Sequence, residues 1–338
     1  MKHLGRLACA VALTLAALAL TLGPTSDAQE LPPFDVWLAE VRAEATARGI
    51  DEEILDRALT GLQPVARTLE RDRAQTEFVL DLDAYLKRRL TRDTVRTAQR
   101  MYSRHRTLVH RVSEKYAVQP RILIAVWGLE SNFGRFAGVR PTVPTLATLA
   151  YDARRGAMFR NELLNALEIV DRGDIELERL NGSWAGALGQ PQFMPSSYLR
   201  FAQDFDGDGR RNIWTSQPDV FASIAYYLQQ HGWTDGETWG REVRMSAAVR
   251  RKADALPRRS EGCRAERLMT TAWPLAWWQR LGVRSLNHAA LPKAGMAASL
   301  VEAGRRTFLV YRNYEALLEY NCAHTYALSV ALLADRLQ

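Results

Sequence analysis

The sequence has 338 residues, of which 47% are hydrophobic and 25% are charged. This balance excludes an intrinsically disordered chain and gives enough length for one large globular domain or two smaller ones. The formal net charge of +7 favours an anionic polymer as partner, and cell-wall glycan with acidic peptides, acidic lipid and nucleic acid all qualify. Nucleic acid is not specifically indicated, because the basic residues are scattered and their short clusters at 87–89 and 250–252 fit solvated surface.

The N-terminus has the pattern of a secretory signal. A basic start is followed by an apolar run over 7–22 and by a small-residue cleavage motif that ends at Ala28. We therefore expect residues 1–28 to be a cleaved signal peptide, which leaves a mature chain with a net charge of +6. Cys9 stands near the start of the apolar run, so most of the run follows the cysteine, which is the wrong order for a lipoprotein signal. An uncleaved membrane anchor is the alternative.

The next segment, 34–116, is helical in pattern throughout. It predicts an N-terminal helix with an apolar stripe, a short helix that Asp51 caps, a helix over 78–89 and one long helix over 91–116. None of these elements carries chemistry on its own. We expect a scaffold that supports the helix that follows.

That following helix carries Glu130. The residues from Ile122 to Leu129 are apolar on every side, which predicts a helix buried all round, with Pro120 in its first turn and Gly134 as a left-handed cap. At the C-terminal end of a buried helix, desolvation and the helix dipole both favour the neutral form of a carboxyl group. A carboxyl group that stays protonated near neutral pH can act as a general acid. A glutamate that simply reaches solvent at a helix end is the alternative.

The segment 139–170 predicts two further helices. Pro141 and Pro144 favour a turn, Thr145 can cap a helix that runs to Ala150, and 159–170 is amphipathic. The cations at the junction, Arg154 and Arg155, fit surface salt bridges, although they could also hold acidic wall peptides.

A glycine-rich loop follows over 181–203. Its glycines permit tight turns and close approach of the backbone to a ligand. Its hydrogen-bonding side chains are neutral, and they stand beside aromatic ones: Ser183, Trp184, Gln190, Gln192 and Phe193. Amides suit sugar hydroxyl and acetamide groups, and rings suit the apolar faces of pyranoses. A glycine-rich hairpin around a core tryptophan is an equally good interpretation of this stretch alone.

An acidic loop begins at Asp204 and leads into a helix over 216–230. The spacing of its residues matches positions one, three, five, six, seven and nine of a calcium loop: Asp204, Asp206, Asp208, Gly209, the Arg210 carbonyl and Asn212. Thr215 replaces the bidentate glutamate of the twelfth position, and Asp219 is the nearest carboxylate that could close the site. We predict a bound Ca²⁺ of modest affinity, with an empty acidic turn as the alternative.

The C-terminal third is less regular. We expect short strands and loops over 235–298, then a short extended piece and one helix within 308–337, with Tyr320 and Tyr326 flanking the start of that helix. Cys263 and Cys322 remain after signal cleavage, and an oxidising compartment permits them to pair. Because the sequence does not give their geometry, the disulfide is left open here.

Five ordered motifs together resemble the membrane-bound lytic transglycosylase B family of bacterial murein-cleaving enzymes. They are GLESNFG at 128–134, GSWAGALGQPQFMPSSY at 182–198, DFDGDGRRNIW at 204–214, IAYYLQQHGW at 224–233 and EYNCAHTYA at 319–327. The resemblance runs from about Phe34 to the C-terminus. It implies a mainly α, lysozyme-like (α+β) fold with a small β segment before the C-terminal helix. The implied domains are a helical scaffold over 29–118 and a catalytic domain over 119–338 that contains the EF-hand-like loop 204–219.

The resemblance also implies roles for individual residues. Glu130 matches the single catalytic acid and base. The residues that match the glycan-holding cleft are Ser183, Gln192, Tyr227, Tyr320, Asn321 and Tyr326. The calcium positions fall on Asp204, Asp206, Asp208, the Arg210 carbonyl and Asp219. Two departures are Gln190-Pro191, where relatives often have tyrosine and glycine, and Cys322 inside the tyrosine motif, which strengthens the case for pairing with Cys263.

The implied activity is cleavage of the β-1,4 bond between N-acetylmuramic acid and N-acetylglucosamine without water. No second carboxylate recurs near the motifs, so Glu130 is expected to act first as acid and then as base, forming a 1,6-anhydro ring. We expect peptidoglycan strands as partner, structural Ca²⁺, no organic cofactor and no nucleic acid. The expected protein is periplasmic and monomeric, at most peripheral to the membrane, and without an appended wall-binding domain.

Two alternatives stay open. One is a hydrolytic muramidase in which Glu130 activates water, since residue types alone do not decide whether water or the C6 hydroxyl attacks. The other is a calcium-stabilised protein that binds peptidoglycan without turnover. A buried, unpaired carboxyl group argues against it, because a binding module has no need for that cost.

Overall fold

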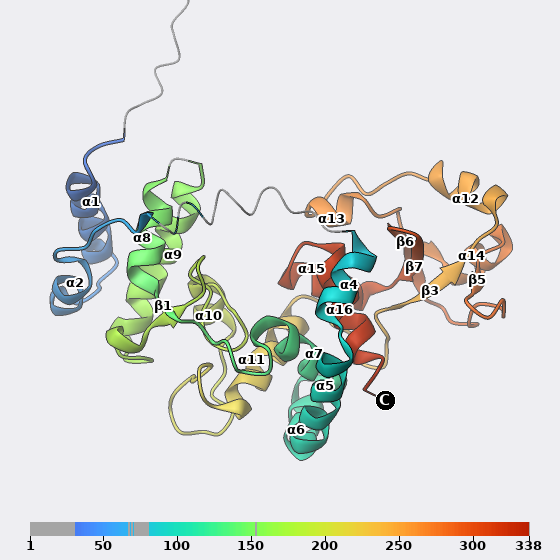
Figure 1. Cartoon of the computed structure of the whole chain (residues 1–338), viewed down its shortest axis with the longest axis horizontal. Helices are drawn as coiled ribbons and strands as arrows, with labels where there is room; N and C mark the ends of the chain where they lie inside the picture. Colours follow the sequence, from blue (N-terminus) through green and yellow to red (C-terminus); the bar gives the residue numbers. More distant parts are fainter. Residues whose placement is uncertain (1–30, 67, 69, 71–80, 153, 338) are drawn as a thin grey trace, which may run out of the picture.

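The computed structural model describes residues 31–66, 68, 70, 81–152 and 154–337. The predicted signal peptide lies outside these residues, and the helix predicted over 78–89 lies only partly within them. In Figure 1 the N-terminal helices form one end of an elongated molecule and a small sheet forms the other. Across the described ranges, no helix combines the length and apolar character needed to span a bilayer.

The first two helices pack together at one end of the molecule. Helix α1, Phe34–Ala47, buries Trp37 and two smaller apolar residues of the same stripe. Helix α2, Glu52–Leu59, begins after Asp51, whose carboxylate accepts a hydrogen bond of 2.7 Å from the backbone N–H of Glu53. The predicted cap is therefore confirmed.

The single long helix predicted over 91–116 is wrong. Two helices occupy this range, α5 (Arg92–Arg104) and α6 (Arg106–Tyr116), and they meet at His105. The backbone of His105 leaves helical geometry, with φ −100° and ψ 13°, and its ring packs edge-on against Trp127. Because no glycine or proline marks the break, the local pattern gave no sign of it.

Helix α7, Pro120–Ser131, lies near the middle of the molecule, among α5, α6, α11 and α16. As predicted, proline stands in its first turn and Ile122 to Leu129 are buried all round. The predicted cap at Gly134 is only partly right, because the left-handed backbone already begins at Asn132. Asn132, Phe133 and Gly134 form a left-handed hook, with φ values of 50°, 59° and 78°.

The hook lets the Phe133 ring fold back onto α7. A Cβ atom at Gly128 would lie 2.5 Å from a carbon of that ring, which is closer than atoms pack in proteins. Glycine at position 128 is therefore required for this contact, even though glycine weakens a helix.

Helices α8 (Thr142–Tyr151) and α9 (Gly156–Asp171) pack side by side. The predicted start of the first of them is wrong, because Thr145 lies inside the helix and donates its hydroxyl to the Pro141 carbonyl at 2.8 Å. Strand β1, Arg140–Pro141, pairs antiparallel with strand β2, Asn181–Gly182. This pairing anchors the start of the glycine-rich loop beside α8.

Two helices flank the acidic loop. Helix α10, Pro195–Phe201, precedes it, and helix α11, Gln217–Gln230, follows it. The hydroxyl of Ser216 caps α11 by accepting a hydrogen bond from the backbone of Asp219. The predicted helix–loop–helix context is confirmed.

The segment predicted as strands and loops over 235–298 contains helices as well. Its helices are α12 (Ala247–Asp254), α13 (Arg264–Arg267) and α14 (Leu275–Leu281). The strands are β3 (Gly240–Arg244), β4 (Trp273–Pro274), β5 (Arg284–Ser285), β6 (Ala297–Ala303) and β7 (Arg306–Val310). They form an antiparallel sheet in the order β4-β6-β7-β3-β5. Trp278 and Leu309 belong to a separate small core on this sheet.

The C-terminal segment holds two helices where one was predicted. They are α15 (Arg312–Tyr320) and α16 (His324–Ala334), and the chain is extended at Asn321 between them. Helix α16 packs against α7 and against α4, Leu82–Arg89. The architecture is thus mainly α with a small sheet, as predicted, whereas the proposed domain boundary at residue 118 stays a prediction.

Cys263 and Cys322 form a disulfide bond. Cys263 precedes α13, and Cys322 lies in the connection between α15 and α16. The bond ties the sheet region to the connection that separates Tyr320 from Tyr326.

Replacing both Cys263 and Cys322 by serine is expected to lower the free energy of unfolding by about 2–4 kcal/mol, because the bond closes a loop with a sequence separation of 59. Urea denaturation of the oxidised protein and the variant measures the difference. A reducing agent should bring the parent down to the variant and leave the variant unchanged. Equal stability of the two oxidised proteins would contradict the expectation.

Candidate functional site

Glu130 is the second-last residue of α7 and is only partly exposed. Burial raises the pKa of its carboxyl group from 4.5 to about 7, while Tyr326 and the charge of Arg89 act in the opposite direction. No carboxylate of the described residues is among the groups that shift this pKa. Glu130 is therefore poised to be protonated or ionised near neutral pH, and its proton can be given up or taken back at small cost.

Arg89 lies behind Glu130 at the end of α4. Its guanidinium group donates a hydrogen bond to the backbone carbonyl of Leu129, the residue before the glutamate. Its Nε atom is buried and has no partner within the described ranges. The sequence analysis did not single out Arg89, because it grouped this residue with the solvated basic cluster 87–89. The one feature of the sequence that could have indicated a role is its position at the end of a helix.

Tyr326, in the first turn of α16, lies beside Glu130. Its hydroxyl is buried and meets no acceptor at hydrogen-bonding geometry in the described part of the chain, yet it is near enough to lower the pKa of Glu130. Burial raises the pKa of Tyr326 well above its ordinary value, so this hydroxyl keeps its proton. It can donate to the carboxylate that forms when Glu130 ionises.

Of the other two tyrosines predicted for the site, Tyr320 packs against Tyr326 and Tyr227 packs against Tyr320, and the hydroxyls of both are engaged. Tyr320 donates to the Pro191 carbonyl at 2.8 Å, and Tyr227 donates to the Glu319 carbonyl at 2.7 Å. Their ring centroids are 4.8 Å apart, and the Tyr320 and Tyr326 rings stack at 6.3 Å. These tyrosines join α11, α15, α16 and the glycine-rich loop.

The remaining predicted binding residues are less directly connected to Glu130. Gln192 has a left-handed backbone, with φ 57°, and its amide donates to the Gly189 carbonyl at 2.8 Å. The hydroxyl of Ser183 accepts from backbone N–H groups within its own turn. Asn321 is exposed between α15 and α16. The structure thus brings Tyr320 and Tyr326 close to Glu130 and places Tyr227 against Tyr320. Gln192 follows the residue that accepts from Tyr320. Ser183 and Asn321 make no direct contact with the glutamate within the described residues.

Gln190 connects α7 to the acidic loop. Its buried side chain accepts a hydrogen bond of 2.7 Å from the Trp127 indole and donates one of 2.8 Å to the Trp214 carbonyl. Its backbone N–H also donates to the Ile213 carbonyl at 2.9 Å. The sequence suggested a sugar-binding amide at this position, whereas the structure shows that both functional groups of the side chain are used internally.

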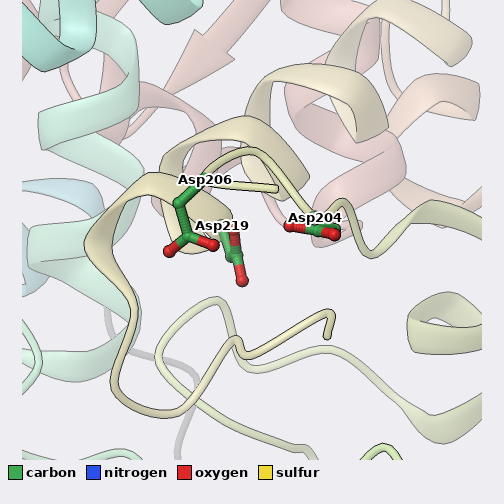
Figure 2. A group of neighbouring side chains, drawn as sticks. All are labelled: Asp204, Asp206 and Asp219. Carbon is green, nitrogen blue, oxygen red and sulfur yellow. The ribbon is translucent and has the colours of Figure 1, made fainter. Parts of the chain in front are cut away.

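The acidic loop brings together three of the predicted metal ligands. Oxygen atoms of Asp204, Asp206 and Asp219 lie within 4.8 Å of one another, from the loop and the start of α11 (Figure 2). Asp219 is fully buried, and its carboxylate accepts from the backbone N–H groups of Phe205 and Asn212 at 2.8 Å each. A buried carboxylate beside two others fits a hard cation such as Ca²⁺, which prefers oxygen ligands.

Asp208 and Arg210 are placed differently. Asp208 is not a member of the three-carboxylate group, and its carboxylate accepts from the backbone N–H of Arg210 at 2.8 Å. Thr215, at the twelfth position of the loop, accepts a hydrogen bond of 2.7 Å at its hydroxyl from the Asn212 amide. Asp219, and not a residue at the twelfth position, is the third carboxylate of the group.

The chain is similar in sequence and in structure to known bacterial proteins. The chain is 36% identical over 154 residues to the membrane-bound lytic murein transglycosylase B of Escherichia coli K12, a match that spans 45% of this chain and 42% of that protein. SltB3 from Pseudomonas aeruginosa, solved in complex with NAG-anhNAM-pentapeptide, has a TM-score of 0.81 and 40% identity, covering 90% of this chain and 79% of that one. Escherichia coli Slt35, solved in complex with calcium, has a TM-score of 0.74 and 25% identity, covering 90% and 92%.

The family described as the transglycosylase SLT domain matches residues 33–335, nearly the whole of the described structure. Its match includes α7 with Glu130, the tyrosines of α11, α15 and α16, and the acidic loop. This chain belongs to the SLT family of transglycosylases.

Proposed function

We propose that the protein is a lytic murein transglycosylase that cleaves the β-1,4 bond between N-acetylmuramic acid and N-acetylglucosamine. The observation that carries the proposal is a single carboxyl group at the end of a buried helix, with a pKa raised to about 7 by burial. Glycosidases that use two carboxylates need the second one as nucleophile or as base for water. One carboxyl group that serves as acid and then as base fits a reaction in which the substrate supplies its own nucleophile.

In the first step, protonated Glu130 gives its proton to the glycosidic oxygen, and the bond between C1 and that oxygen breaks. The acetamide carbonyl of the substrate stabilises the positive charge that develops at C1. Glu130 is left as a carboxylate, which the charge of Arg89 and the free hydroxyl of Tyr326 stabilise. Such acid catalysis contributes about 10²- to 10⁴-fold in rate.

In the second step, the Glu130 carboxylate takes the proton of the C6 hydroxyl, whose oxygen attacks C1. A 1,6-anhydro ring closes, Glu130 is protonated again and no water is consumed. For the glycan contacts we propose Ser183, Gln192, Tyr227, Tyr320, Asn321 and Tyr326. The three tyrosines border the site, and the engaged hydroxyls of Tyr227 and Tyr320 keep their rings in place.

We further propose that the acidic loop binds Ca²⁺ as a structural ion. The ligands are the carboxylates of Asp204, Asp206 and Asp219, with Asp208 and the Arg210 carbonyl completing the set. The calcium complex of Escherichia coli Slt35 and the three neighbouring carboxylates support this assignment. The ion neutralises like charges that are otherwise held close together, one of them without access to water.

The proposed setting is the periplasm, where peptidoglycan strands are the partner and a secretory signal of residues 1–28 delivers the chain. The basic net charge suits the acidic peptides of the wall. We propose a monomer that needs no organic cofactor and no nucleic acid, and that touches the membrane at most peripherally.

A hydrolytic muramidase is the second candidate, because Glu130 could activate water in place of the C6 hydroxyl. A wall-binding protein without turnover is the third. The raised pKa of Glu130 favours an enzyme over a binding module, and the mass of the product separates the two enzymes.

Glu130→Gln is expected to lower the release of soluble fragments from purified murein by at least ~10²-fold, because glutamine cannot transfer a proton. Mass spectrometry of the fragments from the parent should show products one water lighter than reducing-end muropeptides. Glu114→Gln, at an exposed position on α6, is the matched control and should retain activity. Full activity of Glu130→Gln would contradict the mechanism, and reducing ends from the parent would identify a muramidase.

Arg89→Met is expected to move the alkaline limb of the pH–rate profile to higher pH. Glu130 must be protonated for the first step, so activity falls as the pH rises through its pKa of about 7. Arg89 lowers that pKa, and removing its charge raises it. The exposed neighbour Arg88→Met is the control. An alkaline limb that stays in place, or moves equally in both variants, would contradict a role for Arg89.

Adding Ca²⁺ to the chelator-treated protein is expected to raise its melting temperature, because an ion that binds only the folded state stabilises it by about 2.7 kcal/mol at a hundred times its Kd. Asp219→Asn should abolish the rise, whereas the exposed Asp254→Asn should preserve it. Differential scanning fluorimetry measures both. An identical melting temperature with and without Ca²⁺ would refute the metal site.

A further inference from the structure

A pocket lies at the edge of the sheet, away from Glu130. It has a volume of about 580 Å³ and opens between β3, β5 and the turn that leads into β7. In Figure 1 this edge is at one end of the molecule, whereas α7 is near the middle. Its lining includes five arginines: Arg244, Arg250, Arg284, Arg305 and Arg306. Glu242 is the one acidic residue that lines it.

Two of the five arginines are neutralised by carboxylates. Arg306 makes two hydrogen bonds to Glu242, at 2.9 and 2.6 Å. Arg250 pairs with Glu302, which lies outside the pocket lining. These ion pairs hold the Arg250 and Arg306 side chains in place. The net positive charge of the pocket therefore comes from the other three arginines.

Within the described residues, the other three arginines have no carboxylate partner. Arg284 donates to the backbone carbonyls of Gln279 and Val283, at 2.7 and 2.8 Å, and these partners are neutral. Arg244 and Arg305 are exposed, and neither has an ion pair within the described residues. Three uncompensated positive charges therefore surround one hollow.

This arrangement fits carboxylate groups. Arginine presents several N–H donors in a fixed plane and binds carboxylates through paired hydrogen bonds. The pocket volume lies in the range of sites that hold a short peptide or a small molecule. A hollow of this size with a basic rim selects an acidic peptide over an uncharged sugar.

We propose that this arginine pocket is a docking site for the carboxylate-bearing peptide stems of peptidoglycan, separate from the site where the glycan is cut. The proposal rests on the proposed function, which makes murein the polymer that the protein meets. A wall strand carries many stems, so a stem held in the pocket keeps the enzyme on the polymer while Glu130 acts on glycan elsewhere. Attachment at two points raises the effective concentration of substrate at the second one.

The test is binding of the full mature chain to insoluble sacculi by co-sedimentation. All proteins carry Glu130→Gln so that the polymer stays intact. The double variant R244Q/R305Q removes two exposed side chains that make no ion pair, which spares the fold. The control R92Q/R106Q removes the same charge from exposed positions on α5 and α6. A second pair of binding curves uses sacculi whose stems have been removed by an amidase.

The pocket variant is expected to bind intact sacculi about two- to tenfold more weakly than its parent, the size expected from losing two exposed ion pairs. The control should bind like the parent, and all proteins should bind stem-free strands alike. Unchanged binding of the pocket variant to intact sacculi would overturn the proposal. So would an equal loss in the control, or an equal loss on stem-free strands.

The outcome is independent of the chemistry at Glu130. R244Q/R305Q in the parent with Glu130 should release 1,6-anhydro products from short soluble strands at an unchanged rate. The absence of anhydro products would contradict the proposed function. The binding curves would still test the pocket, because they do not depend on turnover. Normal products with unchanged binding would end the pocket proposal alone.

Discussion

The site depends on the burial of one carboxyl group at the carbonyl end of a helix. Moving the pKa of Glu130 from 4.5 to about 7 corresponds to about 3 kcal/mol in favour of the protonated form. The structure offsets part of this cost with Arg89 and Tyr326, so that the ionised form is accessible. Without burial the group would be ionised at neutral pH, and without the two neighbours its pKa would be higher, which would make it a weaker acid.

The surrounding elements keep that carboxyl group in place. Arg89 holds the carbonyl of Leu129, Gln190 holds the Trp127 indole, and the hook turns the chain away from the helix axis. Because Gln190 also binds the backbone at Trp214, the acidic loop and the glutamate helix share one hydrogen-bonded side chain. The Gln190 side chain thus links the backbone at the end of the acidic loop to the helix that carries the glutamate.

Much of the fold and of the site could be predicted from local pattern. The apolar run before Glu130, the Asp51 and Ser216 caps and the acidic loop each follow from short-range rules of burial and hydrogen bonding. The helix breaks at His105 and Asn321 could not, because tertiary contacts set them and no glycine or proline marks them. The structural roles of Arg89 and Gln190 could not be predicted either. Their partners lie about 40 and 60 positions away in the sequence, and side chains of both types are usually on the surface.

The contact between Gly128 and Phe133 limits how this stretch can change over evolutionary time. Replacing a helical glycine by alanine normally stabilises a helix by about 0.8–1.0 kcal/mol, which makes such substitutions common routes to hardier proteins. Here the added methyl group would displace the ring that closes the hook after Glu130. The helix that carries the glutamate therefore keeps a residue of low helix propensity at position 128. A protein that gained helix stability through alanine at this position would lose the turn that follows the glutamate.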